Sequence, residues 1–163
     1  MRKRQPADPP AAVARDGWQY HHMGIPHAAR HVDEQHLDDL GLHVRGFETS
    51  PYGIEWMRFE PHCDVPEIVR TVPHVAFVVP NLAEALQGRQ ILIAPNQPSP
   101  GVRVAFILDD GAPVELLEFV RGDSNDRNGL PSIALHPTGA VARWAPAGER
   151  ETLGRQQSAE RIG

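Results

Sequence analysis

Two stretches of the sequence, 52 residues apart, begin in the same way. Residues 20–27 read YHHMGIPH and residues 72–79 read VPHVAFVV, so each is a short apolar run with a histidine near its start. Each run is followed by a predicted helix and then by further predicted strands. Neither repeat alone would bury much apolar surface, so the two must pack together. The sequence therefore predicts one fold built from two similar half-domains.

The second repeat follows the order strand, helix, strand, strand, strand. Residues 74–79 form an apolar, β-branched strand. A helix follows, with Asn81 as its N-cap, Glu84 in the capping-box position and Gly88 just past its end. Further strands are predicted at residues 90–94, 102–108 and 113–119, with turns between them that contain proline, glycine or aspartate.

The first repeat is predicted to follow the same order, with one strand weak or missing. Residues 22–26 form a short strand that ends at a proline. Asp33 can cap a helix over residues 33–40 that Gly41 ends. Residues 42–47 and 54–59 are predicted strands, and residues 60–73 form a connection marked by prolines. Each half would then make a curved antiparallel sheet with a helix on one face.

Side-chain alternation indicates which residues of these strands face a common cavity. In residues 74–79 the larger apolar side chains should meet the helix, which leaves His74 on the concave face. In the last strand Glu115 and Glu118 lie on opposite faces, and alternation alone does not decide which one points inward. Either Glu55 or Glu60 is the corresponding glutamate of the first half.

Two alignments of the halves are open at this point. Laying IEWMRF on VELLEF matches Glu55 with Glu115 and is slightly preferred. Laying SPYGIEWMRF on SPGVRVAFIL instead makes residues 54–59 the third strand and sets Glu55 opposite Arg103.

The resulting candidate set is His22, one first-half glutamate, His74 and Glu115. Two imidazoles with one or two carboxylates suit a divalent cation such as Zn, Mn, Fe, Co or Ni, with water in the open positions. A single histidine at the start of a strand is more often a hydrogen-bonded edge residue. Recurrence at matching positions of both repeats is what favours a metal site.

The remaining histidines and the cysteine carry weaker signals. His27 and His31 are four residues apart but do not form an HExxH motif, and together with His36 and His43 they are predicted to lie at the surface. Cys63 lies beside an imidazole and a carboxylate in PHCD, but adjacency in sequence is not the geometry of a catalytic triad.

The composition of the chain indicates which classes of partner are not expected and in which cellular compartment the protein is expected. The formal net charge is −5 and no basic stripe follows the first four residues, so a nucleic-acid partner is not expected. No apolar run approaches the roughly 20 residues of a membrane helix, and one cysteine cannot form an internal disulfide. These features predict a cytoplasmic protein without membrane contact. Residues 1–18 are predicted to be a disordered arm, and residues 122–163 a loosely ordered tail.

The repeat also carries a family resemblance. The segments HHMGIP at 21–26, VPHVAFVVPNLAEAL at 72–86 and GVRVAFILDDGAPVELLEF at 101–119, in their paired order, resemble the vicinal oxygen chelate superfamily of glyoxalases, bleomycin-resistance proteins and extradiol dioxygenases. The resemblance covers about residues 20–120. It implies an α+β fold in which two βαβββ modules, the first of them degenerate, form a cup-shaped antiparallel sheet around a metal. The domain would span residues 19–121, with modules at 20–72 and 73–121.

The resemblance further implies a ligand set and a reaction class. His22, Glu55, His74 and Glu115 would bind a divalent metal, and Glu115 or Glu55 would transfer a proton in a lyase or isomerase acting on a small oxygen-chelating substrate. The alternatives are a protein that sequesters a drug or metabolite without chemistry and an extradiol-type dioxygenase. The dioxygenase would be favoured if Glu55 is not a ligand, because ring-cleaving iron enzymes use two histidines and one carboxylate. A homodimer is also possible.

Overall fold

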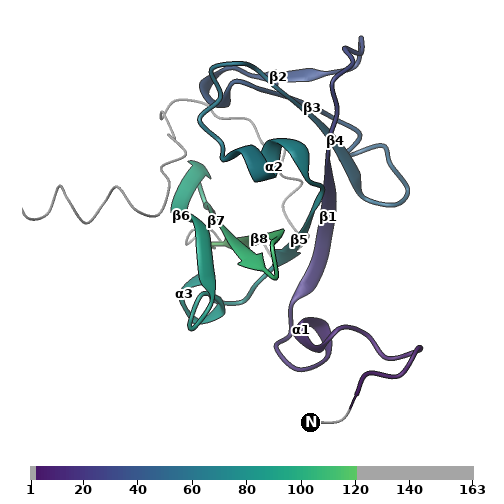
Figure 1. The fold of residues 1–163 in the computed structure, drawn as a ribbon, viewed down its shortest axis with the longest axis vertical. Helices are drawn as coiled ribbons and strands as arrows, with labels where there is room; N and C mark the ends of the chain where they lie inside the picture. The colour runs from purple at the N-terminus through teal and green to yellow at the C-terminus, as the bar shows by residue number, and fades with distance from the viewer. Residues whose placement is uncertain (1–2, 121–163) are drawn as a thin grey trace, which may run out of the picture.

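A computed structural model describes residues 3–120 as one curled sheet with a few short helices (Figure 1). No helix in this part of the chain is long and apolar enough to cross a membrane. The elements, in chain order, are α1 (Ala11–Ala14), β1 (Gln19–Pro26), β2 (Gln35–Leu37), the 3-10 helix η1 (Asp38–Leu40), β3 (Leu42–Arg45), β4 (Ile54–Phe59), α2 (Glu67–Thr71), β5 (His74–Val78), α3 (Leu82–Ala85), β6 (Gln90–Ser99), β7 (Val102–Asp109) and β8 (Ala112–Phe119).

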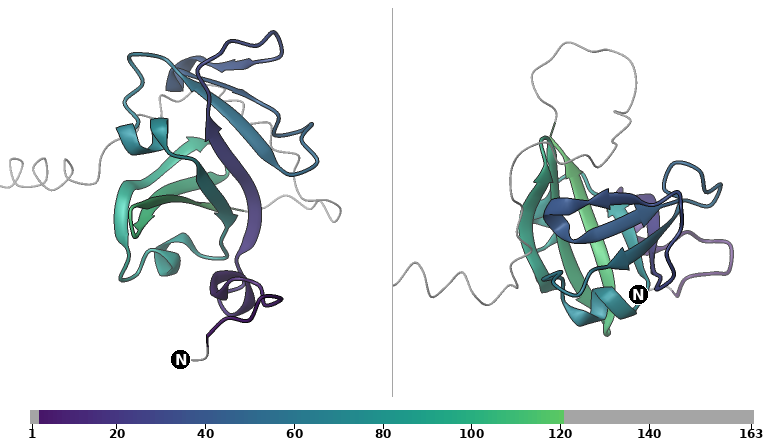
Figure 2. Two further views of the ribbon diagram at one scale, coloured as in Figure 1. Left: turned by 45° about the vertical axis from the view of Figure 1, so that its right-hand side comes forward. Right: turned by 90° about the horizontal axis from the view of Figure 1, so that it is seen from above.

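The strand order shows the duplication directly. The eight strands run β2-β3-β4-β1-β5-β8-β7-β6, so each half repeats one pattern on its side of the central pair. β1 pairs in parallel with β4 just as β5 pairs in parallel with β8, and all other pairs are antiparallel. The sheet curls into a half-barrel (Figure 2). The predicted α+β fold of two modules around a cup-shaped sheet is therefore confirmed, with two parallel pairs in a mainly antiparallel sheet.

The first half lacks a helix rather than a strand. The helix predicted over residues 33–40 is wrong, because this segment forms β2 and η1 instead. Leu37 is buried opposite Leu42 of β3, and Gly41 turns the chain between them in a left-handed conformation with φ 60°. A short helix, α2, occurs instead in the predicted connection at residues 60–73, where Val69 anchors it in the core.

The two faces of the second half bury different side chains. On the outer face α3 packs its Leu82 against Ile107 and Leu116. Its N-cap is Asn81, which accepts a hydrogen bond from the Glu84 backbone N–H, as the capping box predicts. The inner face is a separate apolar cluster of Ala76, Ile93, Val104, Phe106 and Leu117 with Cys63, Val65 and Val69. The prediction that His74 faces away from the helix is confirmed.

Cys63 belongs to this inner core and not to a reactive site. Its side chain is buried, and burial raises the pKa of its thiol. A thiol in apolar surroundings remains protonated and is a poor nucleophile.

The end of the predicted N-terminal arm is ordered. Trp18 is only 6% exposed and packs against Phe77, with 5.8 Å between the ring centroids. The guanidinium of Arg89 lies 4.8 Å from the centre of the indole. α1 precedes this anchor, and Ala12 joins the same apolar cluster. The prediction of a disordered arm is thus wrong for this stretch, because Trp18 buries enough apolar surface to fix it. The predicted tail at residues 122–163 lies outside the described residues.

Glu34 and Arg58 form an ion pair across the outer face of the first half. The Arg58 guanidinium donates hydrogen bonds of 2.6–3.2 Å to the Glu34 carboxylate, and both side chains are largely buried. These bonds hold the pKa of Glu34 at about 2, below its ordinary value of 4.5. A carboxyl group whose pKa is depressed on folding stabilises the folded state above its ordinary pKa, and the effect is lost as the pH falls toward the lower value.

We therefore expect Glu34→Gln to lower the urea midpoint of unfolding at about pH 6, with the difference from wild type shrinking as the pH falls from 4.5 toward 2. Urea unfolding at several pH values measures this. Glu67→Gln is the control, since Glu67 is an exposed glutamate. A difference that does not change with pH would contradict the role assigned to the Glu34 charge.

Candidate metal centre

His22 and His74 come from the two strands at the centre of the sheet. β1 and β5 are antiparallel, and their register sets His22 opposite Ala76 and His74 opposite Gly24. Each histidine thus faces a small residue on the other strand. A Cβ added to Gly24 would lie 2.1 Å from Cε1 of His74, so the imidazole fills the space that a side chain would take. This arrangement brings the two ring centroids to 5.6 Å, at an angle of 80°.

The two glutamates come from the strands that flank this pair. Glu115 of β8 is opposite Ala76, and Glu55 of β4 is opposite Gly24. The two halves therefore contribute matching positions, which confirms the alignment of Glu55 with Glu115 and rules out the alternative with Arg103. Glu118 points outward to Arg103, 2.9 Å away, so Glu115 is the inward carboxylate of β8.

The four side chains meet in a buried cluster. Oε2 of Glu115 lies 3.2 Å from Nε2 of His22 and 3.2 Å from Nε2 of His74. Oε2 of Glu55 lies 3.6 Å from Nε2 of His22. The exposed fractions are 2% for each histidine, 3% for Glu55 and 8% for Glu115. All four residues predicted as ligands are thus brought together, whereas Glu60, the alternative to Glu55, lies with His36 and His43 instead.

The ring nitrogens at the centre of the cluster point toward Glu115. Within the described residues, Nε2 of His22 and both ring nitrogens of His74 are buried without an aligned hydrogen bond. Buried polar atoms in this state are uncommon unless a ligand or water completes them. His22, His74 and Glu115 each offer one atom, and these atoms all lie within 4.8 Å of one another. Two imidazoles and a carboxylate fit a divalent transition metal with positions left for water or substrate.

The side chains of the cluster also shift one another's pKa values. Burial favours the neutral forms of both His22 and Glu115, but their proximity outweighs it. The pKa of Glu115 is therefore held well below its usual range by the two imidazoles, and the pKa of His22 is raised by the carboxylates. Burial raises the pKa of Glu55, and nearby His22 and His74 only partly offset this. The cluster thus contains an ionised Glu115 beside a carboxyl, Glu55, that holds its proton more tightly.

An apolar pocket opens onto the cluster. His22, Glu55 and Glu115 line part of it, and most of the remaining wall consists of aliphatic and aromatic side chains such as Leu42, Met57 and Phe106. Ser99 also lines this pocket, and its hydroxyl is buried without a hydrogen-bond partner in the described part of the chain. The pocket thus offers three ionisable groups and one hydroxyl to a ligand that is otherwise enclosed by hydrocarbon.

Comparisons with known proteins give structural neighbours only. No protein-family model matches the sequence, and no curated protein matches it. Among solved structures, methylmalonyl-CoA epimerase from Mycobacterium tuberculosis is 20% identical, with 63% of this chain and 88% of that chain covered and a TM-score of 0.44. A hypothetical protein from Bacillus halodurans C-125 is 17% identical, with 66% of this chain and 99% of that chain covered and a TM-score of 0.44.

His21 is a member of the site that the sequence analysis missed. Its Nδ1 lies 2.8 Å from Nδ1 of His22. An irregularity in the β1–β5 register between Tyr20 and His22 lets two consecutive residues bring their rings together. Burial, and then the charge of His22, lower the pKa of His21 to about 4, so His21 is neutral and its Nδ1 can accept a hydrogen bond from the Nδ1–H of His22. The hydrogen bond turns Nε2 of His22 toward the cluster. The HH pair at the strand start was the available signal.

We expect His21→Phe to weaken metal binding by about 10- to 100-fold, the usual effect of removing the hydrogen bond that orients a ligating histidine. Phenylalanine suits the site, because the ring of His21 already packs against Phe47 and Phe119. Competition with a zinc-chelating dye measures the affinity, with His27→Phe as the matched control at a partly exposed position. Unchanged affinity in His21→Phe would show that His22 needs no such support.

Proposed function

We propose that this chain is a metal-dependent lyase or isomerase of the glyoxalase type, a member of the vicinal oxygen chelate superfamily that acts on a small oxygen-chelating substrate by proton transfer. One observation carries the proposal. Buried imidazoles from the two halves of a duplicated sheet direct their Nε2 atoms to the same oxygen of Glu115, and a second buried carboxyl, that of Glu55, lies alongside.

The residues of the site divide into those that would bind the metal and those that would act on the substrate. His22, His74 and Glu115 would hold the cation. A divalent cation there would act as a Lewis acid and stabilise negative charge on a substrate oxygen. The apolar wall of the pocket would exclude water from the substrate and strengthen the electrostatic interactions inside. The free hydroxyl of Ser99 would donate a hydrogen bond to a polar group of the substrate.

Glu55 is the better candidate for proton transfer. Glu115 contacts both imidazoles at 3.2 Å, which suits a ligand. Glu55 contacts only His22, at the longer distance of 3.6 Å, and also lines the pocket. Its raised pKa brings this carboxyl closer to neutral pH, where a general acid or base works best. We therefore assign Glu55 to carry the proton and Glu115 to bind the metal.

A second candidate is an extradiol-type dioxygenase. The three ligand atoms that lie mutually close belong to two histidines and one carboxylate, and Glu55 is not among them. That donor set is the one used by non-haem iron oxygenases. The two candidates differ in the metal that supports activity and in the requirement for dioxygen.

The test loads the metal-depleted chain separately with Zn, Ni, Co, Mn or Fe(II). It then follows the isomerisation of a glutathione hemithioacetal, the exchange of the α-proton of an acyl-CoA thioester in D2O and the cleavage of catechols. Turnover or exchange that is lost in Glu55→Gln, while the metal stays bound, supports the proposal. Cleavage of a catechol only with iron and dioxygen would favour the dioxygenase. Bound metal without activity on any substrate would favour a binding protein that performs no chemistry.

A further inference from the structure

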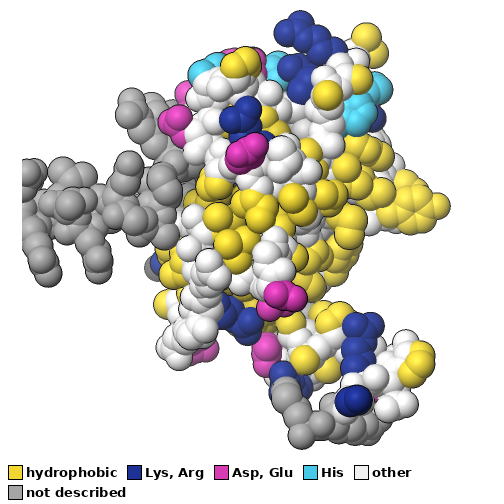
Figure 3. All heavy atoms as spheres, viewed as in Figure 1, with side chains coloured by type: hydrophobic (Ala, Val, Ile, Leu, Met, Phe, Trp, Pro, Cys, Tyr) yellow, Lys and Arg dark blue, Asp and Glu magenta, His cyan; other side chains and the backbone are white. Residues whose placement is uncertain are grey.

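A second group of histidines lies on the outer face of the first half. His36 of β2 and His43 of β3 are directly opposite each other in the register, and their rings stack with 4.1 Å between centroids and an angle of 5°. In the space-filling view, histidine side chains gather at the end of the molecule formed by β2 and β3 (Figure 3). The second half covers its equivalent face with α3, whereas the first half has no helix there.

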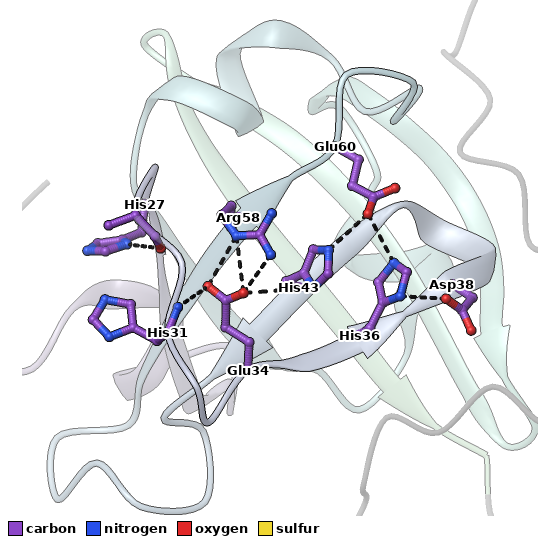
Figure 4. Close-up of polar contacts among 9 residues, drawn as sticks. His27, His31, Glu34, His36, Asp38, His43, Arg58 and Glu60 are labelled. Carbon is purple, nitrogen blue, oxygen red and sulfur yellow. Dashed lines mark hydrogen bonds and ion pairs between the residues drawn. The ribbon is translucent and has the colours of Figure 1, made fainter.

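Glu60 lies across the edges of both rings. Its Oε1 is 2.9 Å from Nε2 of His43 and 3.3 Å from Nε2 of His36 (Figure 4). Its other oxygen is 3.3 Å from Nε2 of His62. One atom from each of His36, His43 and Glu60 lies within 4.8 Å of the other two. This cluster resembles the buried centre in composition, with two imidazoles and a carboxylate.

The opposite edge of each ring also faces a carboxylate. Nδ1 of His36 is 2.5 Å from Asp38, and Nδ1 of His43 is 3.8 Å from Glu34, which Arg58 fixes in place. For His36 the closer carboxylate, Asp38, lies at Nδ1, which favours the tautomer that carries its proton there and leaves the Nε2 lone pair free. Metal-binding histidines commonly have this arrangement, in which an outer carboxylate orients the ring and makes it a stronger ligand.

We propose that Nε2 of His36, Nε2 of His43 and the Glu60 carboxylate form a second binding site for a divalent transition metal of the zinc, nickel or copper class. The site is open to solvent, so water would complete the coordination, and His62 is within reach as a further ligand. Imidazole-rich sites select these metals over magnesium and calcium, which prefer oxygen ligands. The site is independent of the proposed enzymatic function, because it shares no residue with the buried centre.

The test titrates the metal-depleted full chain with Zn2+ by calorimetry and counts equivalents. Wild type is expected to bind two, and the double variant His36→Gln/His43→Gln only one. His27→Gln/His31→Gln is the matched control, because that pair of rings also lies close, at 5.0 Å between centroids, but the described residues place no carboxylate against either ring. This control should still bind two equivalents, and His74→Ala should lose the buried equivalent and keep the outer one.

Glu60→Gln provides a second variant that preserves side-chain volume. We expect it to weaken the outer equivalent by at least about 10-fold while leaving the buried equivalent unchanged. Bound Cu2+, followed by its electron paramagnetic resonance, reports nitrogen ligands directly, and the signal of the outer ion should disappear in the histidine double variant. The proposal is overturned if that double variant and wild type bind the same number of equivalents, or if the His27 and His31 control loses as much.

Discussion

We expect replacing His74 by alanine to lower metal affinity at the buried centre by at least about 100-fold and to abolish any metal-dependent turnover. His74 supplies one of the two imidazoles that contact Glu115, and its side chain is buried between Gly24 and Phe106. Truncation leaves Glu115 with a single imidazole partner. Metal content by mass spectrometry after dialysis measures the loss, and circular dichroism checks that the sheet remains folded.

His27→Ala is the control for His74→Ala, because His27 lies outside the buried cluster. The His27→Ala variant should therefore retain its full metal content. Full metal content in the His74→Ala variant would show that His74 is not a ligand of the metal. Reduced metal content combined with unchanged binding of a small ligand would instead point to a sequestering protein that does not need the metal.

Gly24→Ala is expected to disrupt the same centre from the neighbouring strand. The new Cβ would lie 2.1 Å from Cε1 and 2.4 Å from Nε2 of His74, which is far inside van der Waals contact. Either the imidazole leaves its position or the two central strands separate. We expect a loss of about 1–3 kcal/mol in the free energy of unfolding, typical of overpacking, together with loss of metal binding.

Ala76→Gly is the matched control for Gly24→Ala, since Ala76 occupies the equivalent position opposite His22. Ala76→Gly removes a Cβ instead of adding one. It should therefore lower the free energy of unfolding by about 0.5–1 kcal/mol and leave metal binding unchanged. The clash is tested by combining Gly24→Ala with His74→Ala, which removes the ring. Gly24→Ala should lower the free energy of unfolding less in the His74→Ala variant than in wild type. An equal loss in both would mean that the imidazole of His74 does not clash with the new Cβ.

The sequence was sufficient to predict the parts of this molecule that follow from local pattern. The apolar alternation of residues 74–78 fixed which face His74 occupies, and Asn81 with Glu84 located the start of α3. The recurrence of a histidine at the start of two predicted strands led to the buried cluster. These features depend on neighbours along the chain, which a single sequence contains.

The sequence was not sufficient where the conformation of a segment depends on strands that are distant along the chain. Gln35–Leu37 is too short for its period to be recognised, and it becomes a strand because β3 pairs with it. Alternation could not choose between Glu115 and Glu118, and the choice follows from the core under Leu117 and from Arg103 across the sheet. His21 joins the site through an irregularity in β1, which period-two reasoning does not anticipate.

The position of the buried cluster at the junction of β1 and β5 has a consequence for stability. Each half supplies one imidazole and one glutamate, so neither half would retain the ion alone. An ion bound there would link the duplicated halves to each other. It would stabilise the folded sheet by about 2.7 kcal/mol at a free ion concentration 100 times the dissociation constant. Chelation should therefore loosen both halves together.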